Sequence, residues 1–413
     1  MERINGSTKA NASGCNNLHE SRFKTLLFFI RLGGLPFKLQ SVSRIYTAYS
    51  ATIIVCFYIT TVCLIMDTFV HRGQLVYAMM KLRIILVFTV AAWMHLSFSY
   101  RKRDIEQLLF LTDSFTWEDL PTRDPDTGHL TKAGYIPIIQ DLTKNINVFM
   151  IAFNIIQSTV RMVKNHDMYL TSWYPFDVSV SPMYEIANLT QGIAALFGLC
   201  ILLGFQSIHA TLVCVACSQL EKLRLALLYI RQTHVISEHQ FGDEIQQPAV
   251  HEQPNLSDES SRHMQEQLNN CIRHHQQIKR YMEALEDTMN IPLCGILLIF
   301  LILMCFGAFS IVTSWGDHND ISQAVVVYIY AAGSVCLYCW LASELSEQAE
   351  NVRDGVWGCD WVGTPVPFQS CLVFIIATAN KGFTMTAGKF VPVSNSTLMN
   401  VRMLIVPSNT KQQ

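Results

Sequence analysis

Charged side chains are scarce in this chain of 413 residues: they make up only 15% of it, whereas 50% of the residues are hydrophobic. With a mean hydropathy of +0.26, this composition is too apolar for an ordinary soluble domain of this length. The formal net charge of -2 leaves no basic surface for DNA or RNA, and no nucleic-acid module is recognisable. The sequence therefore predicts a polytopic membrane protein, surrounded by lipid, that binds no nucleic acid.

Motifs for catalysis are also missing from the sequence. It has no nucleophile and base pair, no phosphate-binding glycine loop and no paired carboxylates. Most of the 13 cysteines lie within apolar runs, which indicates packing rather than disulfides, and Cys214 and Cys217 have no second pair to complete a metal site. Carboxylates at ligand spacing are lacking beside His95, His209, His274 and His275. We therefore predict no enzyme activity, metal or cofactor.

Long apolar runs recur along the chain, and runs of about 20 residues are long enough to cross the hydrocarbon core of a bilayer. Continuous runs occupy residues 45–66, 82–100, 146–163, 184–217, 291–313 and 321–343. A last candidate span, residues 383–407, contains Lys389, Arg402 and several hydroxyl and amide side chains, which are costly in hydrocarbon without partners. Such a helix crosses where water or protein surrounds it, so it is predicted to line an aqueous pore. The alternative is that it does not cross and ends as a cytoplasmic tail.

The distribution of Lys and Arg predicts the orientation. Basic side chains are frequent before the first run, between the second and third, and between the fourth and fifth, and none lies between residues 313 and 321. Because basic residues near short loops favour the cytoplasmic face, the N-terminus is predicted to be cytoplasmic. The expected fold is therefore an all-α membrane protein with seven transmembrane helices and an extracellular C-terminus.

Helical spacing of leucines continues beyond two of the apolar runs, which predicts a helical cytoplasmic stalk. The segment 234–261 is rich in His, Gln, Glu, Pro and Ser without periodicity and is predicted to be a flexible cytoplasmic loop. The predicted organisation is a tail with an interfacial helix (1–44), helices one to four with the start of the stalk (45–233), the loop (234–261), helices five and six with stalk extensions (262–366), and a short stalk helix followed by the pore-lining helix (367–413).

Several short motifs, in this order, resemble the insect odorant receptors over nearly the whole chain. They are Ser172-Trp173-Tyr174-Pro175-Phe176-Asp177, Ser181-Pro182-Met183-Tyr184-Glu185, Tyr338-Cys339-Trp340 and Thr384-Met385-Thr386-Ala387-Gly388-Lys389-Phe390. The resemblance implies an odorant-gated, non-selective cation channel that forms a heterotetramer with an obligate co-receptor subunit. It also implies a multi-pass protein of the plasma membrane, in the dendrite of an olfactory sensory neuron.

In that family the ligand pocket lies between the outer halves of the second, third, fourth and sixth helices. On this chain those halves offer Met80, Ile84, Phe88, Phe153, Gln157, Thr190, Ile193, Phe197, Tyr328 and Tyr330. Trp173 and Tyr174 are predicted to form an outer lid, or alternatively to anchor the loop at the membrane interface. An aromatic wall with few hydroxyls suits a small volatile with one weak acceptor, such as an ester, alcohol or terpenoid.

The resemblance also makes the last helix the pore. Its pore-lining candidates are Asn400, Met403, Val406, Ser408 and Thr410. The chain departs from the family after Val406, because polar residues stand where the family has a Ser, aromatic and aliphatic run. A gate that closes by dewetting needs apolar side chains, so the partner subunits are expected to supply most of it.

Three other classes of protein stay open at this point. A gustatory receptor of the same superfamily is the nearest alternative. A G-protein-coupled receptor would have the opposite topology, and glycosylation at Asn5 or Asn11 would support it, because only a luminal N-terminus is glycosylated. A secondary transporter usually has internal repeats, and we find none in this sequence.

Overall fold

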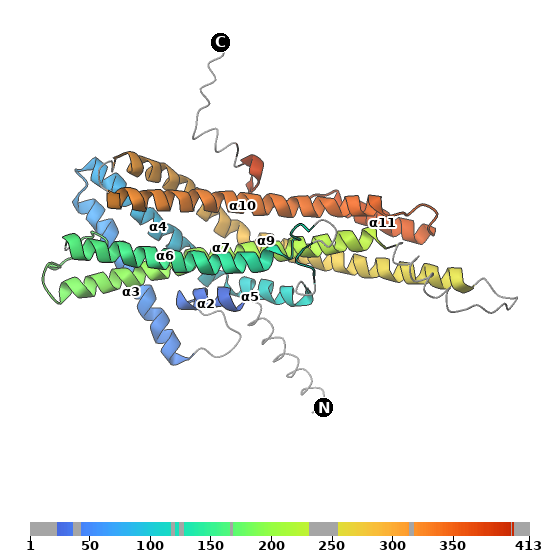
Figure 1. Cartoon of the computed structure of the whole chain (residues 1–413), viewed down its shortest axis with the longest axis horizontal. Helices are drawn as coiled ribbons and strands as arrows, with labels where there is room; N and C mark the ends of the chain where they lie inside the picture. The colour runs from blue at the N-terminus through green and yellow to red at the C-terminus, as the bar shows by residue number, and fades with distance from the viewer. Residues whose placement is uncertain are drawn as a thin grey trace, which may run out of the picture.

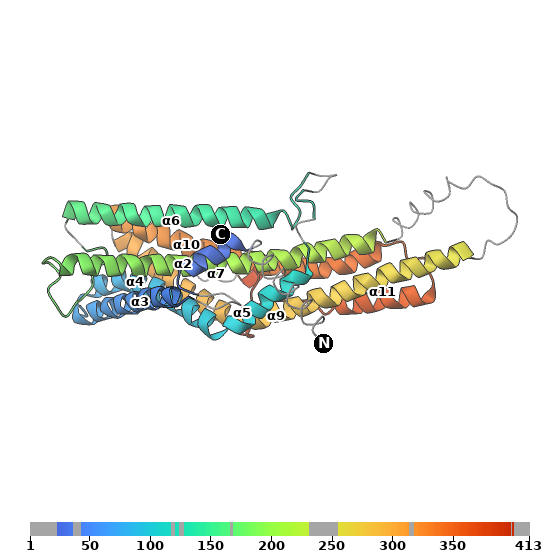
Figure 2. The ribbon, with the colours of Figure 1, turned by 90° about the horizontal axis from the view of Figure 1, so that it is seen from below.

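The computed structural model describes residues 23–35, 43–116, 120–123, 128–165, 168–230, 255–313, 318–397 and 399. Within them the chain is an elongated bundle of long helices (Figures 1 and 2). The helices are α2 Lys24–Leu32, α3 Arg44–Val70, α4 Leu75–Tyr100, α5 Lys102–Leu111, the short 3-10 helix η1 Thr112–Ser114, α6 Tyr135–Asn165, α7 Met183–Leu228, α9 Asn255–Thr313, α10 His318–Gly358 and α11 Val366–Ala379. The strands are β1 Thr386–Ala387 and β2 Val391–Pro392.

Each of the six continuous apolar runs falls inside one helix, in the order α3, α4, α6, α7, α9 and α10. Among the described residues, five helices are long and apolar enough to cross a membrane: α3, most of α4, α7, most of α9 and most of α10. α6 is not one of the five, since its 31 residues include Asp141, Lys144 and several amide side chains. The predicted mostly helical fold with several apolar helices is confirmed, whereas its orientation across the membrane stays a prediction.

α7 is the central helix of the bundle. It contacts α2, α3, α4, α6, α9 and α10, and 89% of its apolar segment is buried. The interfacial helix predicted near the N-terminus corresponds to α2, which contacts α7 and has buried side chains at Phe29 and Ile30. A Cβ at Gly204 of α7 would lie 2.8 Å from Ile30, so the glycine permits this close contact.

The stalk consists of residues 218–228 of α7, 255–287 of α9, 344–358 of α10, and α11. These helices converge at one end of the molecule, which lies to the right in Figure 1. Their apolar side chains form a continuous core, which includes Leu223, Leu285, Leu345 and Phe368. The stalk extensions predicted from leucine spacing are therefore helical, and each is continuous with its apolar segment.

Two predicted boundaries were wrong. α9 begins at Asn255, so residues 255–261 are helical rather than part of the loop, and residues 231–254 lie outside the described residues. The sequence from Asn255 to Glu259 contains residue types that are frequent at the starts of helices.

The last predicted helix also starts later than expected. Residues 385–393 form a hairpin in which Thr386 pairs with Pro392 and Ala387 with Val391, and helical residues begin only at 395. The chain turns at Gly388 and Lys389, both with positive φ, and Pro392 lacks the N–H that a helix interior requires. The pore candidates Asn400, Met403, Val406, Ser408 and Thr410 lie outside the described residues.

Candidate functional site

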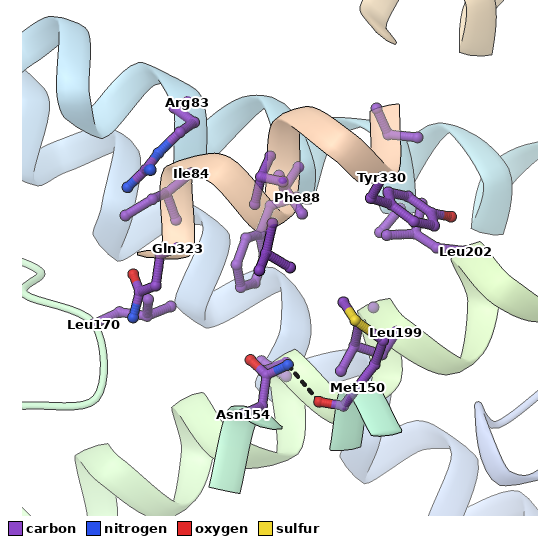
Figure 3. Close-up of a pocket in the computed structure, with 18 of the residues that line it drawn as sticks. Arg83, Ile84, Phe88, Met150, Asn154, Leu170, Leu199, Leu202, Gln323 and Tyr330 are labelled. Atoms are coloured by element: carbon purple, nitrogen blue, oxygen red, sulfur yellow. Dashed lines mark hydrogen bonds between the residues drawn. The ribbon is translucent and has the colours of Figure 1, made fainter. Parts of the chain in front are cut away.

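A cavity of about 170 Å³ lies between the apolar segments of the helices (Figure 3), and no stalk residue lines it. Its wall comes from α3, α4, α6, α7, α9 and α10, together with Tyr169 and Leu170 of the segment that precedes α7. Apolar side chains make up most of the wall, and four of them are phenylalanines: Phe57, Phe88, Phe153 and Phe300. A cavity with an apolar wall binds small molecules chiefly by removing their apolar surface from water.

Five of the ten predicted pocket residues line this cavity: Ile84, Phe88, Phe153, Gln157 and Tyr330. The cavity-facing positions follow helical spacing, as Gln323, Val326, Val327 and Tyr330 do on α10. The predicted helices therefore meet at one cavity, and on each helix only one face reaches it.

The other five predicted residues lie elsewhere: Met80, Thr190, Ile193, Phe197 and Tyr328 are not part of the wall. Tyr328 lies against α9, where a Cβ at Gly307 would be 3.5 Å from its ring. The Phe197 ring packs behind the wall, with its centroid 4.6 Å from that of Phe57. These residues are on the correct helices but on neighbouring faces or turns.

Sequence reasoning missed the contributions of α3, α9 and the segment before α7. The wall also contains Phe57 of α3 and Phe300 and Leu303 of α9. It further contains Arg83 and Asn154, which were not predicted although they lie on α4 and α6, two helices predicted to form the pocket. The spacing of Ile84, Val87, Phe88 and Ala91 was a usable signal, because these residues form one stripe along α4.

The polar groups of the wall hold the segment before α7 in place. Tyr169 donates its hydroxyl hydrogen to Asn154 Oδ1 at 3.1 Å, and Asn154 Nδ2 donates to the Met150 carbonyl at 2.7 Å (Figure 3). From α7, Gln191 accepts from the Leu170 amide at 2.7 Å and donates back to the Leu170 carbonyl at 3.0 Å. This segment is therefore a fixed part of the wall.

The two residues predicted as a lid lie beside this segment and not in the wall. Tyr174 accepts a hydrogen bond from Gln191 at 3.0 Å, and burial raises the pKa of its hydroxyl. Trp173 is more exposed, with 36% of its surface accessible. Tyr169 and Leu170, rather than Trp173 and Tyr174, therefore line the cavity on this side.

A buried ion pair ties α3, α4 and the same segment together. Asp67 and Lys81 are only 4% and 5% exposed, and Lys81 Nζ lies 3.4 Å from Asp67 Oδ2. Tyr77 donates to the same carboxylate oxygen at 2.8 Å, and the Lys81 ammonium donates to the carbonyl and hydroxyl of Thr171. Because buried charges need such partners, this cluster fixes Thr171, which adjoins the wall residue Leu170.

Comparison with known proteins decides the family. The family model for the 7tm odorant receptor matches residues 74–405 of the chain. The chain belongs to this odorant receptor family. The odorant receptor Or2 of Anopheles gambiae is 23% identical over 225 residues, which are 53% of each chain. The odorant receptor 56a of Drosophila melanogaster is 24% identical over 110 residues, which are 27% of this chain and 26% of that relative.

Solved structures show the same fold. The insect olfactory receptor OR5 from Machilis hrabei has a TM-score of 0.66 and 18% identity, over 93% of this chain and 95% of its own. The structure of the same receptor in complex with eugenol has a TM-score of 0.68 and 18% identity, over 94% of this chain and 97% of its own. The resemblance read from the sequence motifs is thus confirmed. Odorant receptors are receptors rather than enzymes, and the described residues of this one contain no group of three potential metal ligands.

The receptor has a second polar cluster on α9, where Pro292 interrupts the helical hydrogen bonds. Because Pro292 has no N–H, the Thr288 carbonyl loses its helical partner, and the Arg101 guanidinium of the α4–α5 junction donates to it at 3.4 Å. Trp93 of α4 donates its indole N–H to the Pro292 carbonyl at 3.1 Å and lies against Gly295, where a Cβ would overlap the ring.

The same turn of α9 holds the hairpin that precedes the last segment of the receptor. The Glu286 carboxylate accepts from the amide of Thr386 at 3.0 Å and from its hydroxyl. The Gly388 amide donates to the Asn290 carbonyl at 2.9 Å. α9 therefore contacts the cavity through Phe300 and Leu303 and the hairpin through residues 286–290.

Proposed function

We propose that this chain is the tuning subunit of an odorant-gated, non-selective cation channel that binds a small volatile in the cavity described above. The observation that carries the proposal is a largely apolar cavity between the helices, in a chain of the odorant receptor family. The cavity volume of about 170 Å³ is below the roughly 300–1,000 Å³ of pockets for drug-sized ligands. The solved Machilis hrabei complex with eugenol supports a small volatile as the ligand.

The proposed mechanism runs from the cavity through α9 to the last segment. A ligand opens the pore only to the extent that it binds the open arrangement more tightly than the closed one. α9 suits this role because Phe300 and Leu303 line the cavity and Glu286 holds the hairpin before residue 395. The pore itself is assigned to the last helix, with Asn400, Met403, Val406, Ser408 and Thr410 as candidates, because its polar residues require an aqueous lining.

Assembly with a co-receptor into a heterotetramer is supported by an apolar surface on the stalk. Large hydrophobic side chains are exposed there on α10, on α11 and between them: Trp357, Val362, Val366, Val373 and Phe374. These residues lie outside the predicted membrane spans, where a monomer has little reason to expose an apolar patch. We therefore propose that these side chains contribute to the subunit contact, in the plasma membrane of a sensory dendrite and with the stalk in the cytoplasm.

The test is to record currents from cells that express the chain with and without a co-receptor, across a panel of volatiles. We expect current only when both subunits are present and only for one chemical class. Signalling without current, together with glycosylation at Asn5 or Asn11, would support a G-protein-coupled receptor instead. Responses to soluble tastants without a co-receptor would support a gustatory receptor.

A matched pair of variants on α7 tests the cavity. Gly198 lines the cavity, and a Cβ there would be 3.7 Å from Ala91, so Gly198→Leu fills the space. A Cβ at Gly192 would meet nothing within 4 Å, so Gly192→Leu is the control. We expect Gly198→Leu to lose the response at normal surface expression and Gly192→Leu to keep it. Equal responses would contradict the assignment of the cavity.

A further inference from the structure

The wall of the cavity is helical except on one side. There it is formed by Tyr169 and Leu170, which belong to residues 168–174, a segment that is neither helix nor strand. Every other described wall residue lies on a helix, and Figure 3 shows Leu170 on this irregular stretch of backbone. A helix face leaves the wall only when the whole helix moves, whereas an irregular segment moves by itself at the cost of its own contacts.

The side-chain amide of Gln191, on α7, holds this segment. Its Oε1 accepts from the Leu170 amide at 2.7 Å, and its Nε2 donates to the Leu170 carbonyl at 3.0 Å. The same Nε2 lies 2.7 Å from the Ser172 hydroxyl and 3.0 Å from the Tyr174 hydroxyl. Gln191 is fully buried. Both backbone polar groups of Leu170 thus bind one side chain, whereas in a helix or strand they would bind other backbone groups.

Two further amides each add one hydrogen bond to the wall residue Tyr169. Asn188, one turn earlier on α7, accepts from the Tyr169 amide at 2.8 Å, and Asn154 of α6 accepts from its hydroxyl at 3.1 Å. These bonds are neutral, unlike the contact between Thr171 and the Lys81 ammonium. Because water replaces a neutral hydrogen bond at a small net cost, the contacts of Tyr169 and Leu170 are the ones that open most readily.

We propose that Gln191 is a positioning residue that controls access to the cavity. Its amide keeps Leu170 in the wall, and a ligand enters and leaves when the bonds to Gln191 are exchanged for bonds to water. This inference rests on the proposed function of the cavity as the odorant site. The same segment is exposed at Thr171 and Trp173, so water is adjacent to it. The alternative is a route from the lipid between two helices, which does not depend on Gln191.

A residue that controls access differs in its effect from a residue that binds the ligand. Gln191 is not part of the wall, so it touches no ligand in the cavity. Its bonds to the segment are present in the empty and in the occupied cavity, and their loss therefore cancels in the affinity. In both states, however, the closed arrangement loses bonds that oppose opening. Gln191→Met should therefore accelerate entry and exit together, by about tenfold for the hydrogen bonds lost.

The experiment measures how fast a small reagent reaches the wall. Val87→Cys places a thiol in the wall, where none of the described cysteines lies. The detergent-solubilised full chain is treated with methyl methanethiosulfonate, and mass spectrometry follows the modified fraction of residue 87 over time. Adding Gln191→Met should raise this rate about tenfold, and adding Tyr169→Phe, which removes only the bond to Asn154, should raise it about threefold.

Two references separate access from a general loss of structure. Gln219→Met is the matched control, because Gln219 is also buried on α7 but donates to the Thr116 carbonyl in the stalk at 3.4 Å. It should leave the rate at residue 87 unchanged. Cys217, which is 2% exposed, reports unfolding in the same samples. An equal acceleration at residue 87 and Cys217 in Gln191→Met would show a merely structural role and overturn the proposal. An unchanged rate at residue 87 would overturn it as well, in favour of a route between helices.

Currents test the same proposal in cells that also express a co-receptor. A volatile that activates the unchanged chain is applied and removed rapidly. In Gln191→Met we expect faster onset and decay, with the half-maximal concentration changed by less than about threefold, because both rates rise together. Unchanged rates with a large loss of apparent affinity would contradict this. If no volatile evokes current at normal surface expression, the proposed channel function fails, whereas the modification rates need no pore and still decide the role of Gln191.

Discussion

The cavity region and the stalk are built largely from the same helices, α7, α9 and α10, and differ in what fills the space between them. In the stalk, Leu223, Leu285 and Leu345 are at most 1% exposed and interlock in a continuous core. Around the cavity, α7 presents Ala194, Gly198 and Leu202 to an open space. One helix thus serves as a core element over one part of its length and as a cavity wall over another.

Specific polar contacts add to the apolar packing around the cavity. The ion pair of Asp67 and Lys81, and the amide of Gln191, hold the segment before α7, in which Leu170 also packs against the core. Specific polar contacts therefore contribute more to the cavity region, and apolar packing contributes more to the stalk. Regions of low packing density open more readily, so a ligand is expected to change the cavity region rather than the stalk.

The largest effect is expected from breaking the buried ion pair. Lys81→Met leaves the Asp67 carboxylate buried beside fewer donors, which costs about 3–5 kcal/mol of unfolding free energy. Thermal or denaturant unfolding of the solubilised chain measures the loss, and Asp67→Asn in the same chain should recover part of it. Lys389→Met is the matched control, because its pair with Asp287 is 67% and 68% exposed and should contribute little. Equal effects of the two lysine variants would remove the distinction between the regions.

The second prediction compares two leucines of α7. Leu223→Ala removes a fully packed stalk side chain and should cost about 2–5 kcal/mol. Leu202→Ala should cost less, because Leu202 already borders the cavity and loses fewer contacts. Unfolding measurements on both variants test this order. The enlarged cavity of Leu202→Ala should also admit longer ligands, whereas a larger loss for Leu202→Ala would show that the wall is packed as tightly as the stalk.

The third prediction concerns the close contact between α4 and α9. Gly295→Ala places a methyl group where the Trp93 indole lies, and such overpacking costs about 1–3 kcal/mol. Gly333→Ala is the control, since a Cβ there meets nothing within 4 Å and alanine favours the helix. We expect Gly295→Ala to lower the unfolding temperature and Gly333→Ala not to lower it. Tolerance of Gly295→Ala would mean that α4 and α9 separate at little cost.

The same distinction explains what the sequence predicted well. Apolar runs mark the spans directly, and leucine spacing marks the stalk, so the six continuous runs and the stalk extensions were placed in the correct helices. The prediction of which face of each helix lines the cavity was less accurate. Tyr328 and Tyr330 are two positions apart on a helix that is apolar on all sides, so nothing in its pattern shows that only Tyr330 lines the cavity.

The hairpin before residue 395 was missed for another reason. Residues 383–407 were interpreted as one polar span, and that interpretation overlooked the turn at Gly388 and Lys389 and the proline that follows. The contacts that dock this hairpin come from Glu286 and Asn290, about 100 residues earlier in the chain. Such long-range polar contacts leave no local pattern, and the same holds for Lys81 and Thr171.

The smallest predicted effect lies where the stalk begins. Lys132 Nζ lies 2.6 Å from the Glu344 carboxylate. Burial opposes the charge of Lys132, but the hydrogen bond to Glu344 and its negative charge outweigh burial and raise the lysine pKa above 10.5. Because the pKa of Lys132 is higher in the folded chain than in the unfolded one, the pair stabilises the fold fully below pH 10.5. This stabilisation is lost as the pH rises through the pKa of Lys132 in the folded chain.

Lys132→Met should therefore lower the unfolding free energy by about 1 kcal/mol at neutral pH, and this difference from the unchanged chain should shrink above pH 10.5. Unfolding at both pH values measures it. Lys279→Met is the control, because its contact with Glu283 is 4.0 Å long and exposed, so the variant should match the unchanged chain at both pH values. A difference for Lys132→Met that persists at high pH would assign its effect to packing against Tyr135 rather than to charge. The stalk would then depend on apolar contacts even where it carries an ion pair.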